Sequence, residues 1–118
     1  MNNAVLIGRL TKDPDLRATN TGKSVCTFTL AVDRRAKGEA DFIPCVAWEK
    51  TAEIVKKYTG KGKQIAVSGR LQSRSYEARN EKRWIVELIV DEVKLLSLRE
   101  DQPFTEPMQP AEAEDIPF

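Results

Sequence analysis

The sequence predicts a mainly β domain, a small barrel of five strands in the order β-β-β-α-β-β, followed by a disordered acidic tail. Three observations lead to this fold class. Five segments read as strands, some with clean apolar and polar alternation and two with apolar residues on both faces, whereas residues 50–58 repeat apolar residues at helical spacing. From Glu100 onward, prolines and acids replace most apolar residues. A chain of 118 residues suits one domain with an appendage.

Residues 2–10 and 24–33 are predicted to form the first two strands. The first is apolar on both faces over residues 4–7, as expected of a barrel strand that also contacts a second subunit. Residues 11–23, which include a proline and a glycine, are predicted to be a loop. The second strand alternates cleanly, and its predicted core side carries Cys26, Phe28, Leu30 and Val32.

The third strand, residues 42–48, is apolar on both faces, so alternation alone leaves its buried side open. We expect the face with Ile43, Cys45 and Ala47 in the core. The opposite face then carries Phe42, Pro44, Val46 and Trp48. The next segment, residues 50–58, changes to helical spacing, and Gly60 is well placed to end a short helix.

The fourth strand, residues 64–76, is predicted to turn Ile65, Val67 and Leu71 inward and Arg70, Gln72, Arg74 and Tyr76 outward. Gly69 permits the sharp coil of a small barrel. After a polar turn, the final strand, residues 83–98, is expected to bend or bulge near Asp91 and Glu92. This order of strands and helix is that of the oligonucleotide-binding barrel, in which strands two and three bind extended ligands.

Charge is distributed unevenly along the chain. Residues 100–118 carry six of the 18 acids and no base, which leaves residues 1–99 with 19 bases against 12 acids. The predicted barrel, residues 1–99, therefore has a net charge of +7 and the predicted tail, residues 100–118, has −6. This asymmetry indicates a body that meets polyanions and a tail that meets another partner, with a merely solubilising tail as the alternative.

Composition argues against several other classes of protein. No apolar run is long enough for a membrane span or a signal peptide, so a cytoplasmic, nucleoid-associated protein is expected. The sequence has no His and no Gly-rich phosphate loop, so we expect neither an enzyme nor a cofactor. Cys26 and Cys45 lack the paired spacing of a metal site and are predicted to be buried apolar residues, with no metal bound.

Aromatic rings interleaved with cations point to a surface for single-stranded nucleic acid, because bases stack on rings while cations follow the phosphates. Phe42 and Trp48 are an even number of residues apart in one strand, about 20 Å along it, and so share a face. Tyr76 lies in line with two arginines of the fourth strand. The predicted binding residues are Arg34, Phe42, Trp48, Lys50, Lys61, Arg70, Arg74 and Tyr76. Trp84 alternates with Val86, Leu88 and Val90 and is taken as structural, with a role at the edge of the binding groove as the alternative.

Several segments resemble the family of bacterial single-stranded DNA-binding proteins. They are the first ten residues, Asp13-Pro14, residues 41–48 (Asp-Phe-Ile-Pro-Cys-Val-Ala-Trp), Ala52-Glu53, Lys61-Gly62, residues 69–76 (Gly-Arg-Leu-Gln-Ser-Arg-Ser-Tyr) and the terminal Asp115-Ile116-Pro117-Phe118. The resemblance implies a homotetramer of oligonucleotide-binding barrels that wraps and protects single-stranded DNA without reading its sequence. It also implies stacking on Phe42, Trp48 and Tyr76, and docking of replication, recombination and repair proteins on residues 115–118.

The chain departs from this family in two places. Residues 34–41 lack the aromatic that members commonly carry just after the second strand, so one stacking surface is missing there. The linker before the terminal residues is short, as in a phage or plasmid copy or a specialised paralogue. Two rival functions share the same residues, namely a barrel that binds RNA or assists a primosome, and a protein-interaction module whose aromatics form a subunit interface.

Overall fold

The computed structural model describes residues 1–96, and the predicted tail, residues 100–118, lies outside the described residues. The boundary between barrel and tail therefore stays a prediction. The elements in chain order are β1 (Ala4–Leu10), β2 (Asp15–Ala18), β3 (Ser24–Asp33), β4 (Ala40–Trp48), α1 (Glu49–Tyr58), β5 (Gln64–Ala78) and β6 (Glu81–Leu95). The predicted mainly β class, with a helix after the strand that ends at Trp48, is confirmed.

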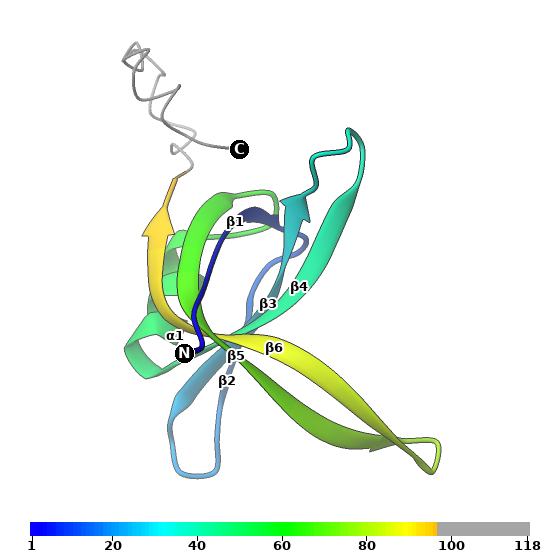
Figure 1. Cartoon of the computed structure of the whole chain (residues 1–118). Coiled ribbons are helices and arrows are strands. Elements are labelled where there is room, and N and C mark those ends of the chain that lie inside the picture. The colour runs from blue at the N-terminus through cyan, green and yellow to red at the C-terminus, as the bar shows by residue number, and fades with distance from the viewer. Residues whose placement is uncertain (97–118) are drawn as a thin grey trace.

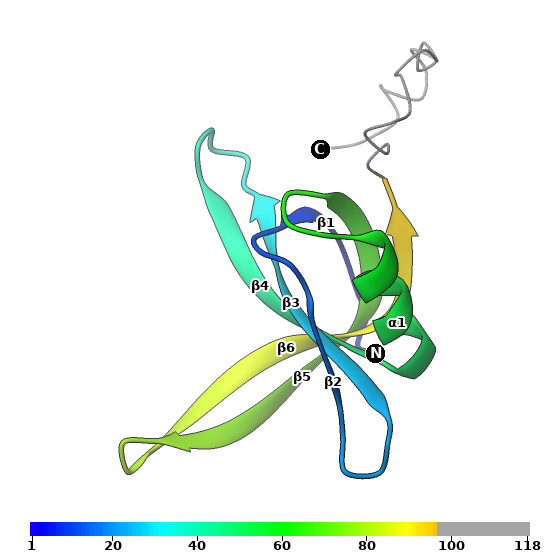
Figure 2. The ribbon, with the colours of Figure 1, turned by 180° about the vertical axis from the view of Figure 1, so that it is seen from behind.

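The strands form one sheet that curls into a barrel (Figure 1). Its order is β1-β5-β6-β4-β3-β2, and a further pairing between β1 and β3 closes it. β4 runs parallel to β6, a pairing that needs a crossover connection, and α1 and β5 supply it. Seen from behind, α1 packs beside the barrel on the side away from the long β5–β6 hairpin (Figure 2).

The segment 11–23, predicted as a loop, contains a strand. β2 pairs antiparallel with the start of β3, from Asp15 opposite Thr27 to Ala18 opposite Ser24. All four of its residues are exposed. A short strand with no buried side chain shows no apolar alternation, and alternation was the signal from which the other strands were predicted. The prediction of five strands is corrected to six by this added strand.

Most side chains of the core are ones that the alternation predicted to face inward, although Val46, predicted on the opposite face of β4, is also buried. Cys26, Phe28 and Leu30 of β3 are buried, and so are Cys45 and Ala47 of β4. The other core residues are Leu10, Ala52, Val55, Ile65, Val67, Leu88 and Val90. Burial raises the pKa of Cys26 to about 11 and that of Cys45 to about 12, so both remain thiols at neutral pH.

The bend expected near Asp91 is a β-bulge. Ser68 pairs with Glu92 and Gly69 pairs with Val90, which leaves Asp91 as the extra residue of β6. Gly69 is required at this point because a Cβ there would overlap the carbonyl oxygen of Ile89. The bulge bends both strands where they leave the barrel.

Beyond the barrel, β5 and β6 continue as a projecting hairpin (Figure 1), and we call its residues 71–86 the arm. The pairing runs without interruption from Gly69–Val90 to Ala78–Glu81. Arg79 and Asn80 close the hairpin with φ of 54° and 65°. Two successive residues of this kind form the tight turn that matches the twist of a hairpin.

Candidate nucleic-acid interface

The outward side chains of four neighbouring strands form one continuous face. Thr27 on β3 lies opposite Val46 on β4, and Val46 lies beside Ile89 on β6. Ile89 in turn lies opposite Arg70 on β5. Paired residues project from the same side of a sheet. The surface therefore runs unbroken across β3, β4, β6 and β5.

Three aromatic rings lie on this surface, which we call the aromatic face after Phe42, Trp48 and Tyr76. Phe42 and Trp48 are in register with Val46, and Tyr76 is in register with Arg70, because even spacing keeps side chains on one side of a strand. Phe42 is 65% exposed, and Trp48 and Tyr76 are each 42% exposed. This resolves the side of β4 that alternation left open, since Cys45 and Ala47 are buried instead.

The two arginines of β5 lie on the aromatic face, and each has an acidic partner. Arg70 is 3.6 Å from Asp91 through Nη1 and Oδ1, a loose pair between exposed groups. Arg74 donates from Nε to Glu87 Oε1 at 2.8 Å and from Nη2 to Oε2 at 3.2 Å. The hydrogen bond to Glu87 raises the pKa of Arg74 above its usual value, so its charge is permanent.

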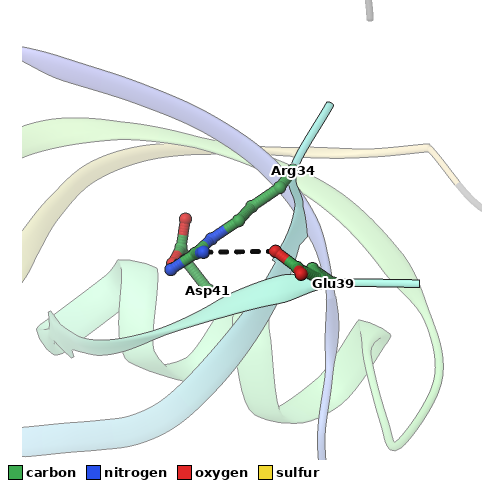
Figure 3. Close-up of polar contacts among 3 residues, drawn as sticks. All are labelled: Arg34, Glu39 and Asp41. Carbon is green, nitrogen blue, oxygen red and sulfur yellow. Dashed lines mark hydrogen bonds and ion pairs between the residues drawn. The ribbon is translucent and has the colours of Figure 1, made fainter. Parts of the chain in front are cut away.

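Arg34 holds the β3–β4 hairpin together at the end of β3. Its guanidinium lies between Asp41 and Glu39 (Figure 3), with Nε and Nη2 at 2.9 and 2.7 Å from Asp41 Oδ1 and Nη1 at 3.3 Å from Glu39 Oε1. The hydrogen bond from Arg34 lowers the pKa of Asp41, so this carboxylate stays ionised at neutral pH. Arg34 already carries two counter-charges, and its partner Asp41 is in register with Ile43 and Cys45, on the side of β4 opposite Phe42 and Trp48.

The two predicted lysines differ in position. Lys50 lies in the first turn of α1, two residues after Trp48, and its ammonium has no ion pair within residues 1–96. Lys61 lies in the connection between α1 and β5, where its backbone N–H donates to Asp13 Oδ1 at 2.8 Å. Lys50 therefore follows the end of β4 that carries Trp48, whereas the structure does not bring Lys61 onto the four strands of the aromatic face.

The inward placement of Leu71 was wrong, and Trp84, which alternation grouped with core residues, is not in the core either. Trp84 is 66% exposed, and Leu71 and Val86 are exposed beside it on the side of the arm opposite Tyr76. Lys82 Nζ lies 5.3 Å from the centre of the Trp84 ring. These residues keep the alternation of a strand that packs on the core. The arm extends beyond the end of the barrel, however, so no core side chains cover them.

Glu87 is a residue of this surface that the sequence analysis missed. It lies on the aromatic face, in register with Ile89, and is the only charged residue buried among those the structure describes. A signal was available, since Glu87 is the one charge in the apolar run 84–90. That signal could not identify its partner, because Arg74 is reached diagonally across two strands.

Other types of site find no support in the described part of the chain. Across residues 1–96 no group of His, Cys, Asp or Glu is arranged to hold a metal ion. Over the same range, no helix is long and apolar enough to cross a membrane.

A partly open barrel whose sheet carries exposed aromatics and cations is the arrangement of an oligonucleotide-binding barrel. The chain belongs to the single-strand binding protein family, whose profile matches residues 1–96. It is 47% identical to single-stranded DNA-binding protein 2 of Clostridium acetobutylicum over the whole of both chains. It is 57% identical to a single-stranded DNA-binding protein of Clostridium tetani, over 81% of this chain and 70% of the relative. Its identity to the Bacillus cereus protein of the same name is 50%, over 84% of this chain and 62% of the relative.

Proposed function

We propose that this chain binds single-stranded DNA on its aromatic face, without reading base sequence, and that it keeps the strands melted and shielded from nucleases. The observation that carries the proposal is the set of exposed rings, Phe42, Trp48 and Tyr76, on one continuous sheet surface. Each base that stacks on such a ring contributes roughly 1 to 3 kcal/mol whatever its identity. Binding of this kind involves no covalent step, so the chain acts as a binding protein and not as an enzyme.

The spacing of the rings suits an extended strand. Phe42 and Trp48 are about 20 Å apart along β4, from six residues at about 3.3 Å each. Tyr76 is on β5, and β6 separates β4 from β5, so the path to it crosses about 10 Å of sheet. A strand that contacts all three rings therefore spans several nucleotides, and its bases must be unpaired and unstacked from one another to stack on the rings.

The family supports the wider role. The relatives compared above all carry the name single-stranded DNA-binding protein. By that likeness we assign this chain a cytoplasmic, nucleoid-associated role in replication, recombination and repair. Residues 115–118 (Asp115, Ile116, Pro117 and Phe118) would recruit the partner proteins of these processes, with Phe118 in an apolar pocket and its carboxylate on a basic residue.

The family likeness also favours a homotetramer. Two apolar surfaces of the single chain are left open to water, at Val5 on β1 and at Leu71, Trp84 and Val86 on the arm. Neighbouring exposed apolar side chains, such as the three on the arm, are typical of subunit contacts. The arm surface lies on the side of β5 and β6 opposite the aromatic face, so a tetramer assembled through it leaves that face free for DNA.

Tryptophan fluorescence tests the proposed function. The chain has only two tryptophans, so the substitution Trp84→Phe leaves Trp48 as the sole reporter. Titration of this variant with oligo-dT is expected to quench its fluorescence strongly, and less at high salt because phosphate contacts release counterions. Duplex DNA of equal length is expected to leave the fluorescence unchanged.

Three results distinguish the proposal from its rivals. Quenching by single-stranded DNA supports stacking on Trp48. Tighter binding of RNA of the same length would favour the RNA-binding barrel instead. The absence of quenching by any oligonucleotide would contradict the proposal and favour an aromatic face that serves as a subunit interface.

A further inference from the structure

A buried carboxylate lies in the middle of the aromatic face. The Glu87 side chain is 10% exposed, whereas the Arg74 side chain bound to it is 54% exposed. On this surface Glu87 is flanked along β6 by Ile85 and Ile89, and it lies opposite Gln72 of β5. An acid beside a path for phosphates works against binding unless it has another role, so Glu87 requires an explanation.

The geometry of the pair shows what Glu87 does to Arg74. Both oxygens of Glu87 accept hydrogen bonds, one from Nε and one from Nη2 of Arg74. This two-point contact fixes the plane of the guanidinium as well as its position. The contact runs diagonally from β5, which carries Tyr76, to β6, which lies next to β4. It therefore also holds the guanidinium on the aromatic face.

The pair also removes the electrostatic attraction that an arginine would offer to DNA. Glu87 cancels the charge of Arg74 at hydrogen-bond distance, so a phosphate that approaches Arg74 meets a nearly neutral pair. Arg34 is neutralised in the same manner by Asp41 and Glu39. Lys50 differs from both because, among the described residues, it has no acidic partner.

We propose that Glu87 is a positioning residue that holds the Arg74 guanidinium as a flat stacking surface for a base, and that Arg74 is not a phosphate contact. A paired guanidinium keeps its planar, weakly hydrated surface after its net charge is cancelled. Its side chain is already ordered, so stacking costs little further entropy. The inference rests on the proposed binding of single-stranded DNA and adds a fourth flat surface to the three aromatic rings.

The dependence of oligo-dT affinity on salt tests this inference, with the full-length chain and the variants Arg74→Lys, Arg74→Gln and Arg74→Gln/Glu87→Gln. A phosphate contact contributes about 0.7 to the slope of log K against log salt for a single strand. A stacking contact contributes nothing to that slope. Arg74→Lys is the matched variant, because it keeps the charge and loses the plane.

If Arg74 stacks, Arg74→Lys and Arg74→Gln each bind about fivefold more weakly than the unmodified chain at every salt concentration, with unchanged slopes. The double variant shows the same loss, which excludes an unpaired buried Glu87 as its cause. Thermal unfolding of each variant checks that the variant is folded at the temperature of the affinity measurements. The double variant still tests the inference if Arg74→Gln alone fails to fold.

Three outcomes would overturn the inference. Arg74 would be a phosphate contact if Arg74→Lys bound like the unmodified chain and Arg74→Gln lowered the slope by about 0.7. It would lie outside the binding path if no variant changed the affinity. The loss would come from Glu87 if the double variant recovered full affinity. Failure of the unmodified chain to bind oligo-dT would instead contradict the proposed function itself.

Discussion

Trp48→Ala is expected to weaken the binding of oligo-dT about thirtyfold, whereas Trp84→Ala is expected to change it less than threefold. The first substitution removes a ring from the aromatic face, and a stacked base is worth roughly 2 kcal/mol, or a factor of about thirty. The second removes a ring of the same type that is even more exposed, but that lies on the far side of the arm. Fluorescence-polarisation titrations of labelled oligo-dT measure both.

This pair of variants tests whether the position of a tryptophan, and not merely its loss, determines the affinity for oligo-dT. Each loses one exposed indole, so a general loss of apolar surface would affect both equally. Trp48 ends β4 and precedes α1, and its ring is outside the core, so its removal is expected to leave the barrel folded. An equal loss of affinity in the two variants would contradict the assignment of binding to the aromatic face.

Removal of residues 115–118 is expected to abolish the binding of partner proteins and to leave the affinity for oligo-dT intact. An aromatic side chain with a free terminal carboxylate can fill an apolar pocket beside an arginine or lysine, and the preceding acids steer it there. The truncated chain lacks the ring, and its terminal carboxylate is on Glu114 instead of beside an aromatic side chain. Surface-immobilised oligo-dT coated with either form, and then exposed to a helicase or polymerase subunit of the source bacterium, measures the difference.

A substitution at the last residue provides the control. Phe118→Ala keeps the charges and the chain length, and is expected to lose most of the same binding because the ring is gone. Removal of the whole tail, residues 100–118, tests a separate hypothesis, that a tail of charge −6 competes with DNA for a body of charge +7, since binding would then tighten most at low salt. Undiminished recruitment by the truncated chain would refute the assignment of residues 115–118.

Alternation in the sequence was sufficient to predict the core of β3, because β3 has one buried and one polar face. It was insufficient for β4, which is apolar on both faces. There the outward position of Phe42 and Trp48 follows from the family resemblance and from the burial of Cys45 and Ala47. β2 was missed because none of its side chains is buried.

The errors at Leu71 and Trp84 share one physical cause. Alternation shows which side of a strand a residue occupies, but it does not show whether another layer covers that side. β5 and β6 have 15 residues each, more than the barrel wall uses, and their outer parts have no layer above them. The ion pair between Glu87 and Arg74 could not be predicted either, because it depends on the register between β5 and β6.

The tight turn at Arg79 and Asn80 has a consequence for how the chain folds. β5 and β6 pair over more residues than any other two strands, and only two residues separate them in sequence. Such a hairpin forms on the microsecond timescale, while the pairing of β1 with β5 must close a much longer loop. β5 and β6, including the arm, are therefore expected to pair first. β1 and β4 are expected to pair with them later. Substitutions in β5 and β6 should then slow folding, and substitutions in β2 should mainly speed unfolding, as stopped-flow measurements would show.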